Sequence, residues 1–346
     1  GGVKIGMAGL VGALTFALSA CATPTDTGIA EPGQASVTQS TVIYEDIARF
    51  WEAYDAIRAE PDRAEQQRLI NRLYIDRGTP GLHAMIRARS YRSQEFVNAI
   101  NAAPEYFDAV RPKTLQVAKY APVIERRLAN IRRIYPEAQP VPVYFVIGAL
   151  RAGGTAIDGK LLIGAELAMT DSSIPSGELM ADFPHLADYF ASSPIDNLVA
   201  LNLHEWVHTQ QRSEGGVDLL SQALFEGVAE FVSTEGIGEP SQQPAITFGL
   251  GHHDAVIEAF ARDIGQKDFS NWIWDSGENA FGQRDLGYYV GYAIAKGYVA
   301  SGRDADPIAT LIELDYRDLD AVDAVVDASG VFPREMAAYR DRMSAN

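Results

Sequence analysis

Two histidines four residues apart make "LNLHEWVHTQQ" (residues 201–211) the stretch of the chain best equipped for chemistry. On a helix, His204 and His208 lie one turn apart on the same face, so both imidazoles can reach one ion at about 2.0–2.1 Å. Glu205 is adjacent to the first histidine, where a carboxylate can act on a water molecule held by the metal. The spacing H-E-x-x-H therefore predicts a zinc site with a general base beside it.

A second helix with two acids follows in "LLSQALFEGVAEFVST" (residues 219–234), where Glu226 and Glu230 are spaced i, i+4. Two carboxylates on one face of a mostly buried helix are costly unless they are paired or bound to a metal. We therefore expect Glu226 to be the third zinc ligand. Glu230 is expected to accept a hydrogen bond from a ligand histidine and fix its tautomer, although a surface acid is the alternative. Gly227 should let the two helices approach closely at the metal.

The elements that must position these residues are mainly helical. "SSPIDNLVALNLHEWVHTQQR" carries helix-start signals, with Ser193 as the expected N-cap and Pro194 at the first helical position. Earlier in the chain, "VPVYFVIGAL" (residues 141–150) has the β-branched and aromatic content of a buried strand. Asp158-Gly159 predicts a hairpin turn before a second strand at residues 160–164.

Helical periodicity prevails on both sides of these strands, and the longest predicted helix covers residues 115–136. The fold class expected from the sequence is therefore α+β and mainly helical, with a small mixed sheet beside a central helix pair and further helices toward both ends. The expected organisation is a signal peptide at 1–21, a tether at 22–40, a helical N-terminal region at 41–137 and a zinc-binding domain with a C-terminal helical part at 138–346.

The N-terminal stretch "GGVKIGMAGLVGALTFALSAC" has a positive residue, Lys4, followed by an apolar run. The run is too short to cross a bilayer but has the length of a signal-peptide core. "LSAC" resembles the lipobox of bacterial lipoproteins, which makes Cys21 the expected lipidation site; an incidental cysteine is the alternative. Since Ala22 rather than Asp follows, the resemblance implies anchoring in the outer membrane facing the periplasm. Residues 22–40, rich in Pro, Gly, Ser and Thr, are expected to form a flexible tether.

The composition is that of a globular protein, with 47% hydrophobic and 22% charged residues among 346. The formal net charge is −17, and the sequence pI is about 4.7. A surface this acidic repels phosphate backbones, so nucleic acid is excluded as an expected partner.

The pair "HEWVH" and "EGVAEF" resembles the gluzincin metallopeptidases, in which the third ligand is a Glu on the helix after the H-E-x-x-H helix. "RDLGYYVGYAIAKGY" (residues 284–298) is similar to the predicted zinc-dependent proteases of bacteria and to the gliding-motility lipoprotein B-like group. The resemblance implies a gluzincin-like core in which an edge strand beside the H-E-x-x-H helix pairs with the substrate backbone. Residues 160–167 are the candidate strand. Their "GAEL" resembles the G-A-M-E-N motif of the aminopeptidase N family but lacks the final Glu-Asn pair, so no exopeptidase activity is inferred.

The resemblance implies a zinc peptidase with one Zn²⁺ per chain and a peptide or protein as its substrate. Glu205 would act as the general base on the zinc-bound water. Gluzincins also use a Tyr or His to stabilise the oxyanion, and Tyr292 is the favoured candidate. The alternatives for that role are Tyr288, Tyr289, His252 and His253, whereas His83 and His185 are expected to be structural.

Two other functions stay open at this point. One is a lipoprotein scaffold of an envelope assembly for motility or secretion, with a structural or vestigial zinc site. A purely structural site would not need Glu205, which counts against this alternative. The other is a zinc hydrolase that acts on a non-peptide bond. Bound metal without turnover would favour the first, and hydrolysis of small esters or amides without peptide cleavage would favour the second.

Overall fold

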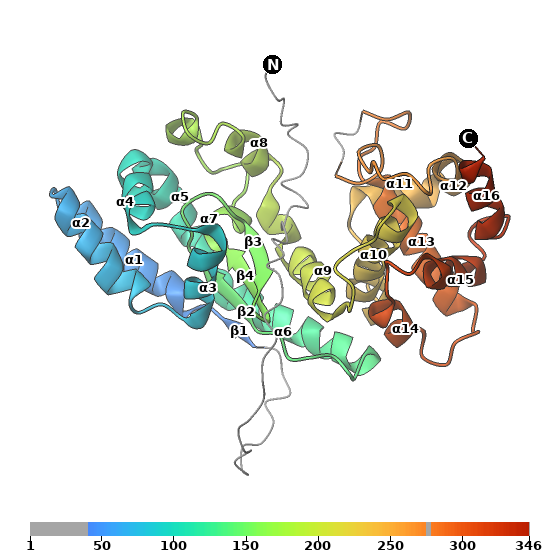
Figure 1. Ribbon diagram of the computed structural model, residues 1–346. Helices are drawn as coiled ribbons and strands as arrows, with labels where there is room; N and C mark the ends of the chain where they lie inside the picture. The colour runs from blue at the N-terminus through green and yellow to red at the C-terminus, as the bar shows by residue number, and fades with distance from the viewer. Residues whose placement is uncertain (1–40, 275–277, 346) are drawn as a thin grey trace, which may run out of the picture. The chain divides into compact units, whose positions relative to one another are not determined.

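The computed structural model describes residues 41–274 and 278–345, and these residues form two compact units. The sheet unit comprises residues 41–129 and 140–198, and the histidine unit comprises residues 130–139 and 199–345. This division differs from the boundary near residue 138 expected from the sequence, because the strands pair and pack with the N-terminal helices (Figure 1). The expected signal peptide, the tether and the lipidation site Cys21 lie outside the described residues.

The sheet unit is built on a four-stranded mixed sheet with the strand order β1-β2-β4-β3. Its strands are β1 (Val42–Ile43), β2 (Val143–Val146), β3 (Gly154–Ile157) and β4 (Lys160–Gly164). The pairs β1·β2 and β2·β4 are parallel, and β3·β4 is antiparallel. All of β2 is buried, which explains its unbroken apolar sequence. The α+β class with a small mixed sheet, expected from the sequence, is confirmed.

Between β3 and β4 the chain turns through Asp158 and Gly159, with φ values of 51° and 68°. Both residues have the left-handed conformation that a two-residue type I′ hairpin requires, so the Asp-Gly turn signal is confirmed. The prediction that residues 160–167 form an edge strand is wrong. Because the hairpin places β3 on one side of β4 and β2 pairs on the other, β4 is an inner strand, and residues 165–168 form helix α7.

Helices enclose the sheet from the N-terminal part of the chain, and α1 and α3 contact β2 (Figure 1). The helices of the sheet unit are α1 (Glu45–Arg58), α2 (Arg63–Ile70), η1 (Asn71–Ile75), α3 (Pro80–Arg89), α4 (Ser93–Ala102), α5 (Pro104–Thr114), α6 (Val117–Ile134, of which residues 130–134 belong to the histidine unit), α7 (Ala165–Ala168), η2 (Gly177–Leu179), α8 (Leu186–Ala191) and η3 (Pro194–Asn197). The Tyr74 hydroxyl anchors the end of β2 because it donates to the Ile147 carbonyl at 2.5 Å and accepts from the Ile147 N–H at 2.9 Å. The long helix expected at 115–136 is confirmed as α6.

The histidine unit is helical throughout its regular elements. They are α9 (Leu198–Gln210, of which Leu198 belongs to the sheet unit), α10 (Leu219–Ser233), η4 (Glu235–Ile237), α11 (Pro244–Gly251), α12 (His253–Ala261), α13 (Leu286–Ala300), α14 (Pro307–Glu313), α15 (Leu319–Ser329) and α16 (Met336–Ser344). Every residue of α10 is buried, which is the pattern of a helix at the centre of a unit. Helices α10 and α13 lie side by side (Figure 1).

Glycines set the short distance between α10 and α13. A Cβ on Gly291 would lie 1.8 Å from the Ala223 carbonyl oxygen, and one on Gly227 would lie 2.0 Å from the Gly291 carbonyl carbon. Gly227 therefore faces α13, and not the H-E-x-x-H helix as the sequence suggested.

In the part of the chain that the structure describes, none of the helices combines the length and the hydrophobicity needed to span a membrane.

Candidate metal centre

Helix α9 carries the H-E-x-x-H motif in its last turns. The chain enters it through the 3₁₀ turn η3, and the α-helix begins at Leu198. Ser193 has φ 56° and makes no side-chain cap, so the N-cap expected from the sequence does not form. The helix itself does form, and it places His204 and His208 one turn apart, 5% and 7% exposed.

Helix α10 carries the two acids, and its start is fixed by polar contacts. The Asp218 side chain accepts the Ser221 N–H at 2.9 Å as an N-cap. Arg340 on α16 holds the same Asp218 carboxylate at 2.8 Å and bonds Asp323 on α15 at 2.6 Å. This anchoring holds α10 so that Glu226 and Glu230 project into the unit, 6% and 4% exposed.

Three side-chain atoms from the two helices meet at one point. The Nε2 atoms of His204 and His208 are 3.0 Å apart, and Glu226 Oε2 lies 3.2 Å from the first and 3.0 Å from the second. All three residues are buried, and together they form a group able to hold a metal ion. The structure thus brings together the three ligands predicted from the sequence.

The dimensions of this triangle fit a small transition-metal ion. Four ligands at 2.0–2.1 Å in a tetrahedron are about 3.3–3.4 Å from one another, and three ligands on one face of an octahedron are about 3.0 Å apart. The observed separations of 3.0–3.2 Å lie between these values. Two imidazole nitrogens and one carboxylate oxygen are also a donor set that zinc and iron(II) accept. The residues therefore fit a small transition-metal ion.

Glu230 occupies the position expected of it behind the first histidine. Its Oε2 accepts a hydrogen bond from His204 Nδ1 at 3.0 Å and another from Gln243 Nε2 at 3.1 Å, and its Oε1 accepts the Ser241 hydroxyl at 2.5 Å. A carboxylate at Nδ1 places the ring proton there and leaves the Nε2 lone pair for a metal.

Two glutamines for which the sequence indicated no role contact the other two residues of this group, His208 and Glu226. Gln211 Oε1 lies 2.5 Å from His208 Nδ1, and Gln222 Nε2 donates to Glu226 Oε1 at 3.3 Å. Gln222 is itself oriented by the Gly216 N–H, which it accepts at 2.9 Å. Since its Oε1 faces Gln222, Glu226 offers a single oxygen to the histidines. The signals available in the sequence were Gln222, four residues before the acid, and Gln211, three residues after the second histidine.

Protonation in this cluster follows from burial and pairing. Burial by itself lowers the pKa of His204, but its hydrogen bonds with Glu226 and Glu230 raise it well above the usual value. Burial raises the pKa of Glu226, but the charges of His208 and His204 and their hydrogen bonds bring it well below its ordinary range. In this cluster an imidazolium is paired with a carboxylate. A divalent cation can bind there in place of the imidazolium protons, because metal binding releases protons from the ligands.

Glu205 differs from the other acids of the cluster. It is 3% exposed, and its Oε2 has no hydrogen-bond partner among the described residues. Burial raises the pKa of its carboxyl group, against the lowering effect of the neighbouring His208 and His204. A buried carboxylate oxygen without a partner is costly, and such an oxygen beside a metal centre is placed to accept a proton.

Helix α13 brings Tyr288, and not the favoured Tyr292, next to the cluster. The Tyr288 ring centroid is 6.1 Å from that of His204, and its hydroxyl accepts the Trp274 Nε1–H at 3.1 Å. Burial raises the pKa of Tyr288 well above its usual value, and the charges of Glu226, Asp285 and Glu205 raise it further. Tyr288 therefore keeps its proton and can donate it in a hydrogen bond.

Tyr292 lies one turn further along α13, where its hydroxyl bonds the carboxylate of Glu235 and its ring meets Phe231. The contacts thus favour Tyr288 over Tyr292 as the hydrogen-bond donor near the three ligands. The sequence offered three tyrosines on one helix and gave no means of choosing the turn that faces α10.

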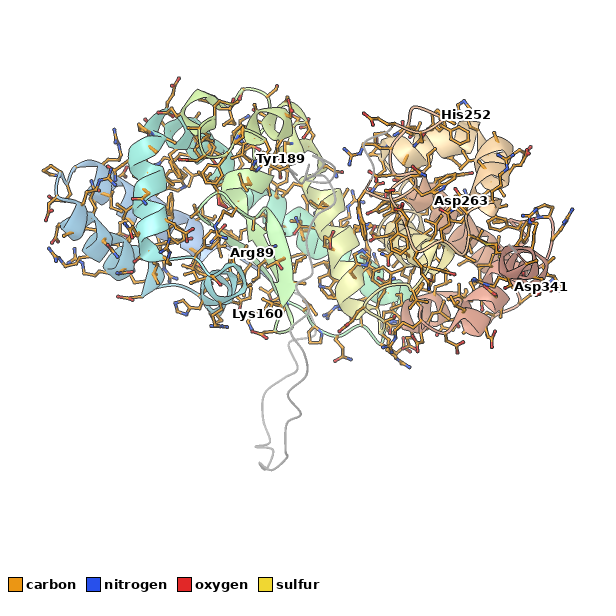
Figure 2. All side chains as sticks on the ribbon, turned by 45° about the horizontal axis from the view of Figure 1, so that its top comes forward. Arg89, Lys160, Tyr189, His252, Asp263 and Asp341 are labelled. Carbon is orange, nitrogen blue, oxygen red and sulfur yellow. The ribbon has the colours of Figure 1, made fainter. Side chains whose placement is uncertain are left out.

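The remaining histidines have other partners. His253 Nδ1 bonds the Tyr289 hydroxyl at 2.6 Å. The ring of His252 stacks on that of Phe248, with centroids 4.0 Å apart. His252 itself is exposed at the surface of the histidine unit (Figure 2). His83 Nε2 lies 2.7 Å from the Ile75 carbonyl oxygen, which agrees with the structural role expected for it. The ring of His185 lies near that of Phe183, with centroids 6.5 Å apart.

A scan of protein-family models, a search of the curated proteins and a search of the solved structures each found no significant match to this chain.

Proposed function

We propose that this protein is a zinc-dependent metallopeptidase whose metal is held by His204, His208 and Glu226. The observation that carries the proposal is the combination of a three-residue triangle with a buried carboxylate oxygen on Glu205 that has no hydrogen-bond partner within residues 41–274 and 278–345. A purely structural zinc site is normally closed by a fourth protein ligand, whereas a catalytic site has three ligands and an open position. The resemblance of both helices to gluzincins supports the same reading.

The chemistry that a bound zinc ion supplies at such a site is Lewis acidity, which lowers the pKa of water toward about 7 and polarises a carbonyl group. Glu205 accepts the proton of the attacking water on its free oxygen and delivers it to the leaving amine. The Tyr288 hydroxyl, which stays protonated, donates a hydrogen bond to the oxyanion that develops on the scissile carbonyl.

A facial triad of two histidines and one carboxylate also suits iron(II) in oxygenases, and a triangle of these dimensions accommodates that ion as well. Glu205 favours hydrolysis, because a general base beside the metal is what peptide hydrolysis requires. Anchoring of the chain through a lipidated Cys21, facing the periplasm from the outer membrane, remains part of the proposal.

The test is metal analysis and peptide hydrolysis with the full chain, wild type beside Glu205→Gln. We expect about one zinc per chain in both proteins and cleavage of a peptide library only by the wild type. Zinc in both proteins without cleavage of any peptide would instead favour the scaffold. Iron in place of zinc, or a folded protein that takes up no metal, would refute the proposal.

A further inference from the structure

The two histidines of the metal centre are held by chemically different partners. His204 Nδ1 faces the carboxylate of Glu230 at 3.0 Å, whereas His208 Nδ1 faces the side-chain amide of Gln211 at 2.5 Å. A carboxylate can only accept a hydrogen bond from a ring N–H, but an amide can either accept or donate. The tautomer of His208 therefore depends on which way the Gln211 amide is turned.

The surroundings of Gln211 settle that orientation. Its other end lies 3.0 Å from the Phe225 carbonyl oxygen, which can only accept a hydrogen bond. The NH₂ group must therefore face Phe225, and the amide oxygen must face His208. Consequently His208 Nδ1 carries a proton, so Nε2, which faces Glu226 and His204, is the ring nitrogen left to bind a metal.

Further contacts keep this arrangement in place. Gln211 is 8% exposed and also bonds the buried hydroxyl of Tyr316, which donates to the Leu311 carbonyl at 2.6 Å. On its other side the His208 ring stacks on Phe225, with centroids 4.6 Å apart and an interplanar angle of 16°. The ring is thus fixed in both position and tautomer by residues that do not ligate.

An amide at this position also limits the negative charge of the cluster. Glu205, Glu226 and Glu230 already bring three carboxyl groups around one site, and all three are buried. A fourth acid would add repulsion in the absence of metal, whereas a glutamine supplies the acceptor without the charge.

We propose that Gln211 is a positioning residue that sets the Nδ1–H tautomer of His208 and thereby prepares its Nε2 to bind the metal. The inference rests on the proposed metal centre, but it does not require that the protein cleave peptides. Its readouts are zinc affinity and the protonation of the His208 ring, and neither depends on turnover.

The experiment compares Gln211→Met and Gln211→Glu with the wild type in the full chain. Methionine keeps the length of the side chain and removes the acceptor, so zinc affinity, measured by competition with a chromophoric chelator, should fall about 10–100-fold. Glutamate restores the acceptor, so its affinity should return to within about threefold of the wild type or exceed it, since it adds a negative charge. Gln210→Met is the matched control, because Gln210 bonds the backbone of Gln139 and should leave affinity unchanged.

Ring ¹⁵N spectra of the metal-free proteins report the tautomer, with His208 assigned through a His208→Gln variant. We expect a protonated Nδ1 in the wild type and a smaller protonated fraction at Nδ1 in Gln211→Met, because methionine offers no strong acceptor there. Unchanged zinc affinity and ring spectra in Gln211→Met would overturn the inference. If Gln211→Met does not fold, Gln211→Glu decides the question. A folded Gln211→Glu protein that binds zinc more than tenfold more weakly than the wild type would overturn the inference, because it keeps an acceptor for His208 Nδ1 and still loses affinity. A wild type without zinc would defeat the proposed function, while the ring spectra would still decide the role of Gln211.

Discussion

Glu226 in the histidine unit and Glu166 in the sheet unit are both buried on helices, yet their pKa values shift in opposite directions. The charges and hydrogen bonds of His208 and His204 outweigh burial at Glu226, and its pKa is well below the ordinary range. Glu166 is 0% exposed, and burial raises its pKa to about 8. Both oxygens of its carboxyl group accept the Gly148 N–H, at 2.9 and 2.8 Å. The hydrogen bonds from the backbone N–H groups of Gly148 and Leu150 lower the pKa of Glu166, but by less than burial raises it.

The partner, and not burial, separates these two acids. Imidazolium protons can leave and be replaced by a metal ion, whereas a backbone N–H cannot be displaced. The cluster around Glu226 is therefore suited to an exchangeable cation. Glu166 is suited to holding the 148–150 loop, and Gly148 leaves room for these contacts, since a Cβ would lie 3.1 Å from a Glu166 oxygen and 3.0 Å from the Tyr91 hydroxyl, closer than most Cβ contacts. The two buried glutamates therefore have different roles, one in a group suited to a cation and the other in holding a loop.

The largest expected effect comes from comparing Glu166 with Glu205, the proposed general base of the histidine unit, by exchanging each of these two acids for its amide and measuring catalysis. Glu205→Gln should lower the rate of peptide hydrolysis by about 10²–10⁴-fold, because the amide cannot accept the proton of water. Glu166→Gln should leave the rate within about threefold, since its carboxyl group contacts the 148–150 loop. Steady-state kinetics, with zinc content measured in parallel, tests both predicted rates. Equal rates for the wild type and Glu205→Gln would show that Glu205 is not the general base.

The tyrosines of α13 provide the next largest effect. Tyr288→Phe should lower kcat by about 10²–10³-fold with zinc retained, because it removes one oxyanion donor. Tyr292→Phe should have little effect on kcat, because the Tyr292 hydroxyl bonds Glu235. A large loss of kcat in Tyr292→Phe with normal kcat in Tyr288→Phe would reverse the assignment made from the contacts.

Metal affinity separates the two buried glutamates directly. Glu226→Gln should weaken zinc binding by more than about 100-fold, which exceeds the loss typical of residues that only support a ligand. Glu166→Gln should bind zinc as tightly as the wild type. Chelator competition at one pH measures both dissociation constants; if both variants lost zinc equally, the effect would come from unfolding and not from ligation.

The pH dependence of stability gives the smallest effect per step, up to about tenfold in the folding equilibrium for each pH unit, and it is specific to Glu166. The pKa of Glu166 is raised in the folded chain, so folding favours its protonated form; the resulting stability is fully present below about pH 4.5 and is lost as the pH rises through about 8. Relative to Glu166→Gln, the wild type should therefore lose up to about 1.4 kcal/mol of unfolding free energy per pH unit across this range. Urea unfolding of the full chain between pH 5 and pH 8 measures the difference, and parallel pH profiles for the two proteins would show that Glu166 ionises freely.

Local signals in the sequence were sufficient for several elements. The Asp158-Gly159 turn formed as expected because its residues tolerate a positive φ, and apolar periodicity marked α6, α9 and α10. Spacing along a helix is itself geometric information, so the positions of His204 and His208 on one face followed directly.

Predictions that depend on residues distant in sequence were wrong or missing. The strand at 160–164 was expected at a sheet edge, but its place is decided by pairing with β2 on one side and β3 on the other. Gly227 was assigned to the wrong neighbour, because a glycine indicates a close approach without indicating which helix approaches. Gln211 was missed because its role depends on the Phe225 carbonyl and on Tyr316, both distant in sequence.

By itself the sequence determined which residues can hold a metal and which carboxylate stands beside it, because helical periodicity converts the spacings in "HEWVH" and "EGVAE" into shared faces. The tertiary structure alone decided that these faces meet with ligand atoms 3.0–3.2 Å apart, that Tyr288 is the nearer tyrosine and that Gln211 orients His208. Those decisions required α10 and α13 to pack at the distance set by Gly227 and Gly291, and hydrogen bonds between separate segments to fix each amide and ring.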